Sequence, residues 1–145
     1  MRVYLDLCAI QRPFDDQSQP RVRAEAEAVL SVLDLSKAGS VVLVTSGAHV
    51  VEIAKCPFPD RRAHVEDVLA VSDVYAMGVP AVLRRAQSYQ ARGIKRFDAI
   101  HLASAVEAGA DVFCTTDDAL LKRGREADTA QAAVVSPLEL IVRLS

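Results

Sequence analysis

Short apolar runs of strand-forming residues alternate with longer amphipathic segments along the chain, and this alternation constrains the fold most. Four such runs predict strands, at residues 3–7, 41–45, 111–115 and 132–135. The segments between them have the apolar spacing of helices. Strands joined through helices make right-handed crossovers, which favour a mainly parallel sheet covered on both faces. We therefore predict a three-layer α/β/α fold with a central sheet of four or five strands.

Proline, glycine and capping residues mark the helix boundaries. Ser46 is a candidate cap, and glycines follow three of the helical patterns, where glycine commonly ends a helix. The polar residues 11–23 are expected to form a long loop. No linker or repeat is visible, so residues 1–145 are interpreted as a single domain. Helices are expected over residues 21–37, 47–55, 60–71, 80–92 and 98–108, from about 117, and from 137 onward.

Composition excludes several classes of protein. There is no run of about 18 apolar residues and no signal-peptide pattern, so no membrane association is expected. The three cysteines lie far apart and lack zinc-ligand spacing, which favours a reduced, cytoplasmic compartment. The formal net charge of −2 gives no overall attraction to nucleic acid. A polyanionic partner would need local basic patches or a metal ion.

Four acidic residues are the candidates for chemistry. Asp6 stands in an apolar strand, where an unpaired carboxylate is costly, although it could accept backbone N–H groups at the strand end. Glu52 could be an ordinary exposed glutamate, and Asp98 and Asp117 could be helix caps. Sites in parallel sheets form beyond the carboxyl ends of strands, so their joint placement predicts a cluster. Oxygen ligands without nitrogen or sulfur suit Mg²⁺ or Mn²⁺.

Two histidines and one cysteine lie near these acids in the sequence. His101 follows Asp98 by three residues and His49 precedes Glu52 by three, so each histidine shares a helix face with a carboxylate. Supporting or packing roles are favoured for both histidines over direct catalysis. Cys8 would share the Asp6 face of the first strand, where it is expected to be a buried structural thiol.

Taken together, these residues resemble the PIN domain, and within it the small bacterial and archaeal proteins of the VapC toxin type. The resemblance spans essentially the whole chain. The blocks around Asp98 and Thr115 are more specific than those around the first two acids. The resemblance rests on Tyr4-Leu5-Asp6, on Ser46 to Glu52-Ile53, on Asp98 to Ala105, and on Thr115-Thr116-Asp117 followed by Leu120-Leu121.

The resemblance implies endonucleolytic cleavage of RNA with Mg²⁺ or Mn²⁺ as cofactor. It also implies a small antitoxin as partner and a homodimer. Thr115 matches the hydroxyl residue that supports the last acid, while Cys8 replaces the family's frequent Asn or Ser, and the loop at residues 11–17 is not a general family feature. By position, the catalytic and metal-binding acids are Asp6, Glu52, Asp98 and Asp117.

Two basic concentrations lie near the proposed ligands, one before Asp98 and one after Asp117. Such clusters are often solvated helix faces, but their position here favours contact with phosphates. Aromatic residues make up only 5% of the chain, so backbone contact is favoured over base stacking. The candidate RNA-binding residues are Arg12, Lys95, Arg96, Lys122 and Arg123.

Other interpretations of the acids are possible. A haloacid-dehalogenase-like phosphatase needs D-x-D where this chain has Asp6-Leu7-Cys8, and a response-regulator receiver needs an acidic pair there. The motifs of P-loop NTPases and α/β-hydrolases are absent from the sequence. Two alternatives stay open: a catalytically silent PIN-like module that binds RNA or protein, and a PIN nuclease that processes RNA without being a toxin.

Overall fold

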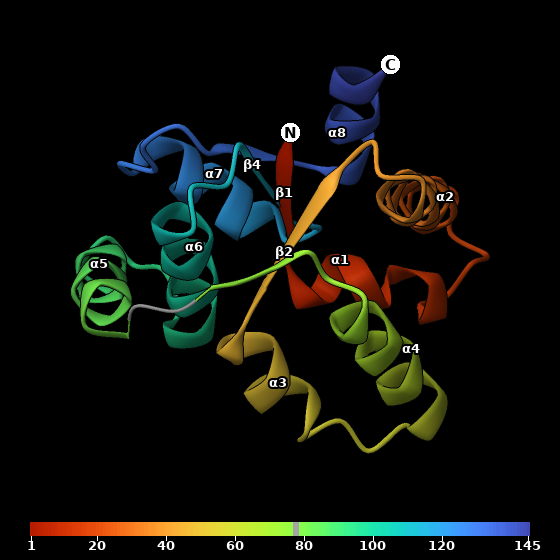
Figure 1. The fold of residues 1–145 in the computed structure, drawn as a ribbon, viewed down its shortest axis with the longest axis horizontal. Helices are drawn as coiled ribbons and strands as arrows, with labels where there is room; N and C mark the ends of the chain where they lie inside the picture. The colour runs from red at the N-terminus through yellow and green to blue at the C-terminus, as the bar shows by residue number, and fades with distance from the viewer. Residues whose placement is uncertain (77–78) are drawn as a thin grey trace.

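A five-stranded, fully parallel sheet forms the centre of the computed structural model, which describes residues 1–76 and 79–145 (Figure 1). The strand order is β3-β2-β1-β4-β5, so β1 is central and is fully buried from Val3 to Leu5. The predicted α/β class and parallel sheet are confirmed. The strands are β1 (Arg2–Leu5), β2 (Val42–Ser46), β3 (Val74–Ala76), β4 (Val112–Cys114) and β5 (Ala133–Val135).

The other helices agree with the predicted segments to within two residues, but three short elements were missed. Helix α1 ends at Gln11, the first residue of the polar stretch expected to be a loop, and the 3₁₀ helix η1 (Arg12–Phe14) follows it, so the loop prediction was wrong at residues 11–14. Strand β3 was also missed. The helices are α1 (Leu7–Gln11), α2 (Pro20–Lys37), α3 (Gly47–Ile53), α4 (Pro59–Ala70), α5 (Val79–Ala91), α6 (Arg96–Glu107), α7 (Asp118–Glu126) and α8 (Pro137–Leu144).

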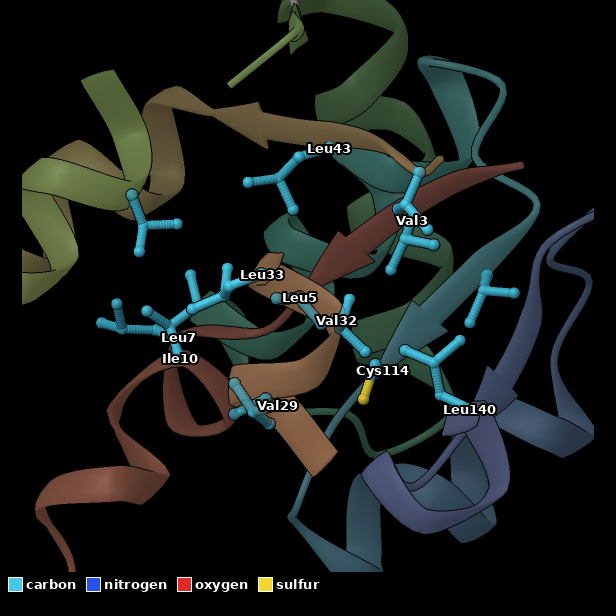
Figure 2. Packing of buried hydrophobic residues seen from close by; sticks show 14 of the residues in the cluster. Val3, Leu5, Leu7, Ile10, Val29, Val32, Leu33, Leu43, Cys114 and Leu140 are labelled. Atoms are coloured by element: carbon cyan, nitrogen blue, oxygen red, sulfur yellow. The ribbon is translucent and has the colours of Figure 1, made fainter. Parts of the chain in front are cut away.

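Helices cover both faces of the sheet and form two separate apolar cores. Because side chains alternate along a strand, Val3 and Leu5 of β1 belong to one core and Tyr4 belongs to the other. The first core packs against α1, α2, α4 and α8, and Figure 2 shows its residues from β1, α2 and α8 meeting. The second core packs against α5, α6 and α7, which lie together on the opposite side in Figure 1. This is the three-layer arrangement that the sequence predicted.

Helix α8 offers a direct test of the first core. Leu140 is fully buried against it, whereas Leu138 on the same helix is 44% exposed. Leu140→Ala should lower the free energy of unfolding by roughly 2–5 kcal/mol, because it removes buried apolar surface and leaves a cavity. Leu138→Ala should change it by less than about 0.5 kcal/mol. Urea unfolding measures both, and equal decreases would contradict the packing described.

Candidate active site

Asp6 lies directly after β1 and begins α1. The predicted strand to residue 7 was too long, because the strand ends at Leu5 and Asp6 is the N-cap of the helix. Its Oδ1 accepts a hydrogen bond from the Leu7 backbone N–H at 2.9 Å, and its own N–H donates to the Cys114 carbonyl at 2.8 Å. The carboxylate is 4% exposed. Asp6 therefore accepts a backbone N–H group at the strand end, which is the role that the sequence left open.

Cys8 lies on α1 rather than on the strand, so its predicted strand face was wrong. The thiol nevertheless lies beside Asp6, with Sγ 3.1 Å from Asp6 Oδ2 and 3.3 Å from Thr115 Oγ1. Burial, followed by the negative charge of Asp6, raises the pKa of the Cys8 thiol well above its ordinary value. The thiol is therefore neutral near pH 7 and donates its proton to the carboxylate.

Asp117 and Thr115 follow the end of β4 and lie at the same edge of the sheet as Asp6. Asp117 is the N-cap of α7, and its Oδ1 accepts from the backbone N–H groups of Ala119 and Leu120 at 2.9 and 3.1 Å. Thr115 Oγ1 donates to Asp6 Oδ2 at 2.9 Å and accepts from the Asp117 N–H at 3.1 Å. The threonine hydroxyl thus bridges two of the four acids and fixes their spacing.

Asp98 differs from the two capping aspartates. Helix α6 begins at Arg96 with Lys95 as its N-cap, so Asp98 lies inside the first turn and the capping interpretation was wrong. Its side chain accepts no hydrogen bond from the residues that the structure describes. Burial, and then the charges of Asp6 and Asp117, raise the pKa of Asp98 to about 6. This shift indicates that its carboxyl group lies in the electric field of the other acids.

Glu52 reaches the site from α3, next to a buried histidine. The helix is capped by Ser46, as predicted, and Glu52 Oε1 lies 3.6 Å from His101 Nε2. His101 is completely buried, and its Nδ1 lies 2.6 Å from the Tyr4 hydroxyl. Burial alone would lower the pKa of His101, but its interactions with Glu52 and Asp6 outweigh burial and raise it. Glu52 is therefore not an ordinary surface glutamate.

Tyr4 is the member of this group whose role the sequence did not reveal. It entered only as part of a family block, because a tyrosine in an apolar strand is first interpreted as core. A buried tyrosine nevertheless needs a partner for its hydroxyl. Here the hydroxyl has two partners, His101 Nδ1 and Ser46 Oγ, the latter at 2.7 Å. The sequence contained that signal, but not the identity of the partners.

The basic candidates divide into exposed and paired side chains. Lys95 and Arg123 are exposed and line a cleft of about 90 Å³ together with Asp98 and Asp117. Arg96 and Lys122 are exposed on the same two helices. Arg12 instead forms ion pairs with buried Glu25 at 2.7 Å and with Asp15 at 3.1 Å. Its guanidinium is therefore already held by the protein.

The oxygen atoms at this edge suit a hard divalent ion. Within residues 1–76 and 79–145, no three histidine, cysteine, aspartate or glutamate side chains are arranged to hold a metal ion as they stand. Asp6 and Asp117 each have an oxygen that does not take part in capping a helix, and Asp98 and Glu52 are not tied to the backbone by side-chain hydrogen bonds in the described part. The raised pKa of Asp98 indicates negative charge that a cation would neutralise. The donor set therefore fits Mg²⁺ or Mn²⁺.

Comparison with known proteins identifies the fold. Neither family models nor curated protein sequences match the chain. Among solved structures, PAE2754 from Pyrobaculum aerophilum matches with a TM-score of 0.52 and 21% identity, over 99% of this chain and 89% of that one. VapBC2 from Rickettsia felis, solved bound to a DNA fragment from their promoter, matches with a TM-score of 0.59 and 12% identity, over 92% and 98%.

These matches show that the chain has the PIN-domain fold. The fold is similar to that of VapBC2, in agreement with the resemblance noted in the sequence. Among the described helices, none is long and apolar enough to cross a membrane.

His49 holds the start of α3 against the end of β1. Its Nε2 lies 2.8 Å from the Leu5 carbonyl, and its Nδ1 accepts from the Ser46 N–H at 3.2 Å. These two bonds require a neutral ring with its proton on Nε2, because a proton on Nδ1 would oppose the Ser46 N–H. Burial, and then the charge of His101, lower the pKa of His49 to about 3.

This shift predicts a loss of stability in mild acid. The unfolded imidazole takes up a proton below about pH 6.5, whereas the folded one resists protonation down to about pH 3. The stabilising effect is therefore complete above pH 6.5 and falls as the pH falls, by about 2 kcal/mol between pH 7 and 5. His49→Gln should remove this part of the pH dependence, although the variant is less stable overall. Urea unfolding at pH 7, 6 and 5 measures the free energy of unfolding of the wild type and the variant. Parallel pH profiles of the two proteins would contradict the prediction.

Proposed function

We propose that this chain is an Mg²⁺- or Mn²⁺-dependent endoribonuclease and the toxin of a type II toxin–antitoxin pair. The observation that carries the proposal is the meeting of three aspartates at one edge of the sheet. The Thr115 hydroxyl bonds to Asp6 Oδ2 and to the Asp117 N–H, and Asp98 lines the same cleft as Asp117. Burial and the charges of Asp6 and Asp117 accordingly raise the pKa of Asp98 to about 6. Like charges gathered at the carboxyl edge of a parallel sheet lower stability, and a bound cation would explain their arrangement. The VapC-like fold supports a nuclease among the chemistries that such an ion serves.

The four acids would hold the ion in two different ways. Asp6 and Asp117 are fixed by their caps and by Thr115, so they provide a rigid half of the site. Asp98 and Glu52 would adjust to the ion, because no side-chain hydrogen bond in the described part ties them to the backbone. A bound Mg²⁺ or Mn²⁺ lowers the pKa of a water and offsets charge on a phosphodiester.

The remaining task of the chain is to place the RNA. Lys95 and Arg123 line the cleft beside Asp98 and Asp117, so they would contact the phosphates next to the bond that is cut. Arg96 and Lys122 would extend this contact along the same two helices. Arg12 would affect RNA binding only indirectly, because its guanidinium is already paired with Glu25 and Asp15.

Replacing Asp6 tests the catalytic proposal. Asp6→Asn keeps an oxygen that can cap α1 but removes the negative charge, so the fold should persist. Cleavage of total cellular RNA in Mg²⁺ should fall at least about 100-fold, as expected when an essential electrostatic interaction is removed. Asp118→Asn is the matched control, because Asp118 is exposed and pairs with Arg21 outside the acidic group. Mapping of the RNA ends confirms endonucleolytic cutting.

The same assay separates the alternatives. A folded Asp6→Asn variant that cuts RNA as fast as the wild type would contradict the assignment. Absence of Mn²⁺ binding in the wild-type protein, together with binding of RNA or protein, would favour a silent module. Specific cuts in precursor RNA without growth inhibition would favour an RNA-processing nuclease.

Removing the two cleft cations tests how RNA is held. The double variant Lys95→Ala/Arg123→Ala should bind single-stranded RNA more weakly whatever its sequence. The slope of log affinity against log salt should fall by about 1.4, because about 0.7 is expected for each phosphate that the protein no longer neutralises. Arg143→Ala on α8, an exposed arginine outside the cleft, is the control. An unchanged salt slope in the double variant would contradict the proposed role of these two cations.

Partner and location follow from the same proposal. One structural neighbour is VapBC2, solved bound to a fragment of promoter DNA. By analogy, a small antitoxin encoded beside this chain would cover the acidic site, and the toxin would be a cytoplasmic homodimer. Copurification of the two gene products, with loss of cleavage in the complex, would support this part of the proposal.

A further inference from the structure

A line of buried polar side chains runs beneath the acidic site and ends at Glu52. The Tyr4 hydroxyl lies 2.7 Å from Ser46 Oγ and 2.6 Å from His101 Nδ1, and His101 Nε2 faces Glu52 Oε1 at 3.6 Å. Ser46, Tyr4 and His101 are at most 1% exposed. The line joins the ends of β1 and β2 to α6, on the face of the sheet that α6 covers.

His101 Nε2 is an unsatisfied atom in this line. It is buried and has no hydrogen-bond partner among the described residues, because 3.6 Å to Glu52 is just longer than a hydrogen bond. A buried polar atom left unpaired costs about 1–3 kcal/mol. Glu52 is 32% exposed and can move, whereas His101 is packed on all sides. A small movement of Glu52 would complete the hydrogen bond.

The proton positions along the line follow from its donors. Ser46 Oγ accepts from the Ala48 N–H at 3.3 Å, which leaves its own proton free to be donated to Tyr4. Tyr4 then donates to His101 Nδ1, so the neutral imidazole has its proton on Nε2, facing Glu52. The opposite order would turn the lone pair of Nε2 toward a carboxylate. Electrostatics therefore selects an N–H aimed at Glu52.

We propose that His101, held in place by Tyr4, is a positioning residue for Glu52. Its Nε2–H binds Glu52 Oε1 and turns the other carboxylate oxygen toward Asp98 and Asp6. Asp6 and Asp117 are fixed by the helices that they cap, but Glu52 lies near the end of α3 and has no such anchor. The inference rests on the proposed metal-dependent function and names the residue that completes its ligand set.

Nitrogen NMR tests the proton positions without any metal. The chain has three histidines, so long-range ¹H–¹⁵N spectra at pH 8.5 can be assigned with the variants His49→Gln and His64→Gln. His101 should carry a proton on Nε2, and that resonance should shift in Glu52→Ala. Tyr4→Phe should shift the resonance of the unprotonated Nδ1, because that nitrogen loses the hydroxyl that donates to it. The matched control is Tyr89→Phe, which removes another buried hydroxyl, bonded to the Asp128 carbonyl at 2.6 Å. An unprotonated His101 Nε2 in the wild-type protein would overturn the proposal.

Mn²⁺ titration by electron paramagnetic resonance tests the effect on Glu52. Tyr4→Phe should weaken Mn²⁺ binding about 10-fold, the usual size for a residue that orients a metal ligand. In a Glu52→Ala background the same substitution should change affinity less than about 2-fold, because Tyr4 acts through Glu52. Tyr89→Phe should have no effect in either background. Equal decreases in both backgrounds would overturn the positioning role.

The two experiments distinguish the proposals. If the wild-type protein binds no Mn²⁺, the proposed function fails. The NMR result then tests the positioning proposal by itself. If the His101 Nε2–H resonance does not shift in Glu52→Ala, the two side chains are not in contact and the positioning proposal fails.

Discussion

The junction at the carboxyl end of β1 is the constraint on which the rest of the structure depends. There one buried carboxylate, Asp6, continues the backbone pairing to Cys114, starts α1 and accepts the Thr115 hydroxyl. Thr115 in turn holds the N–H of Asp117. Burying a charge is tolerated because each of its oxygens has donors. The central strand pair and the starts of two helices are thereby fixed relative to one another.

The sequence predicted the fold well where burial controlled it. The central strands are apolar on both faces because helices cover both, so they appear as continuous apolar runs. Strand β3 was missed because it is a three-residue edge strand whose middle residue, Tyr75, is 50% exposed, which leaves no such run. Helix α1 was missed because its five residues directly follow the strand and show no helical period. Short elements are determined by their neighbours rather than by their own composition.

The site was predicted as a set of residues, but not as a set of contacts. Sequence position indicated that Asp6 and Asp117 lie at the carboxyl edge of the sheet, because each follows a strand, whereas Glu52 and Asp98 lie on helices. It did not distinguish Asp117, which caps its helix, from Asp98, which lies inside the first turn. Nor did it reveal the partners of Tyr4 and His101, which lie 97 residues apart in the chain. Contacts of that range follow from the register of the sheet and from helix packing.

The four acids differ in how the surrounding protein stabilises their charges, and this difference is informative about the site itself. A fold selected for stability alone would satisfy all four carboxylates or leave them in water. Here Asp6 and Asp117 are satisfied by caps, while half-buried Asp98 has a pKa raised to about 6, which means that its ionised form destabilises the fold near neutral pH. The two apolar cores on either side of the sheet supply the stability that tolerates this repulsion. Negative charge kept at a rigid edge, with one partly exposed glutamate beside a buried histidine, is an arrangement that a cation would stabilise.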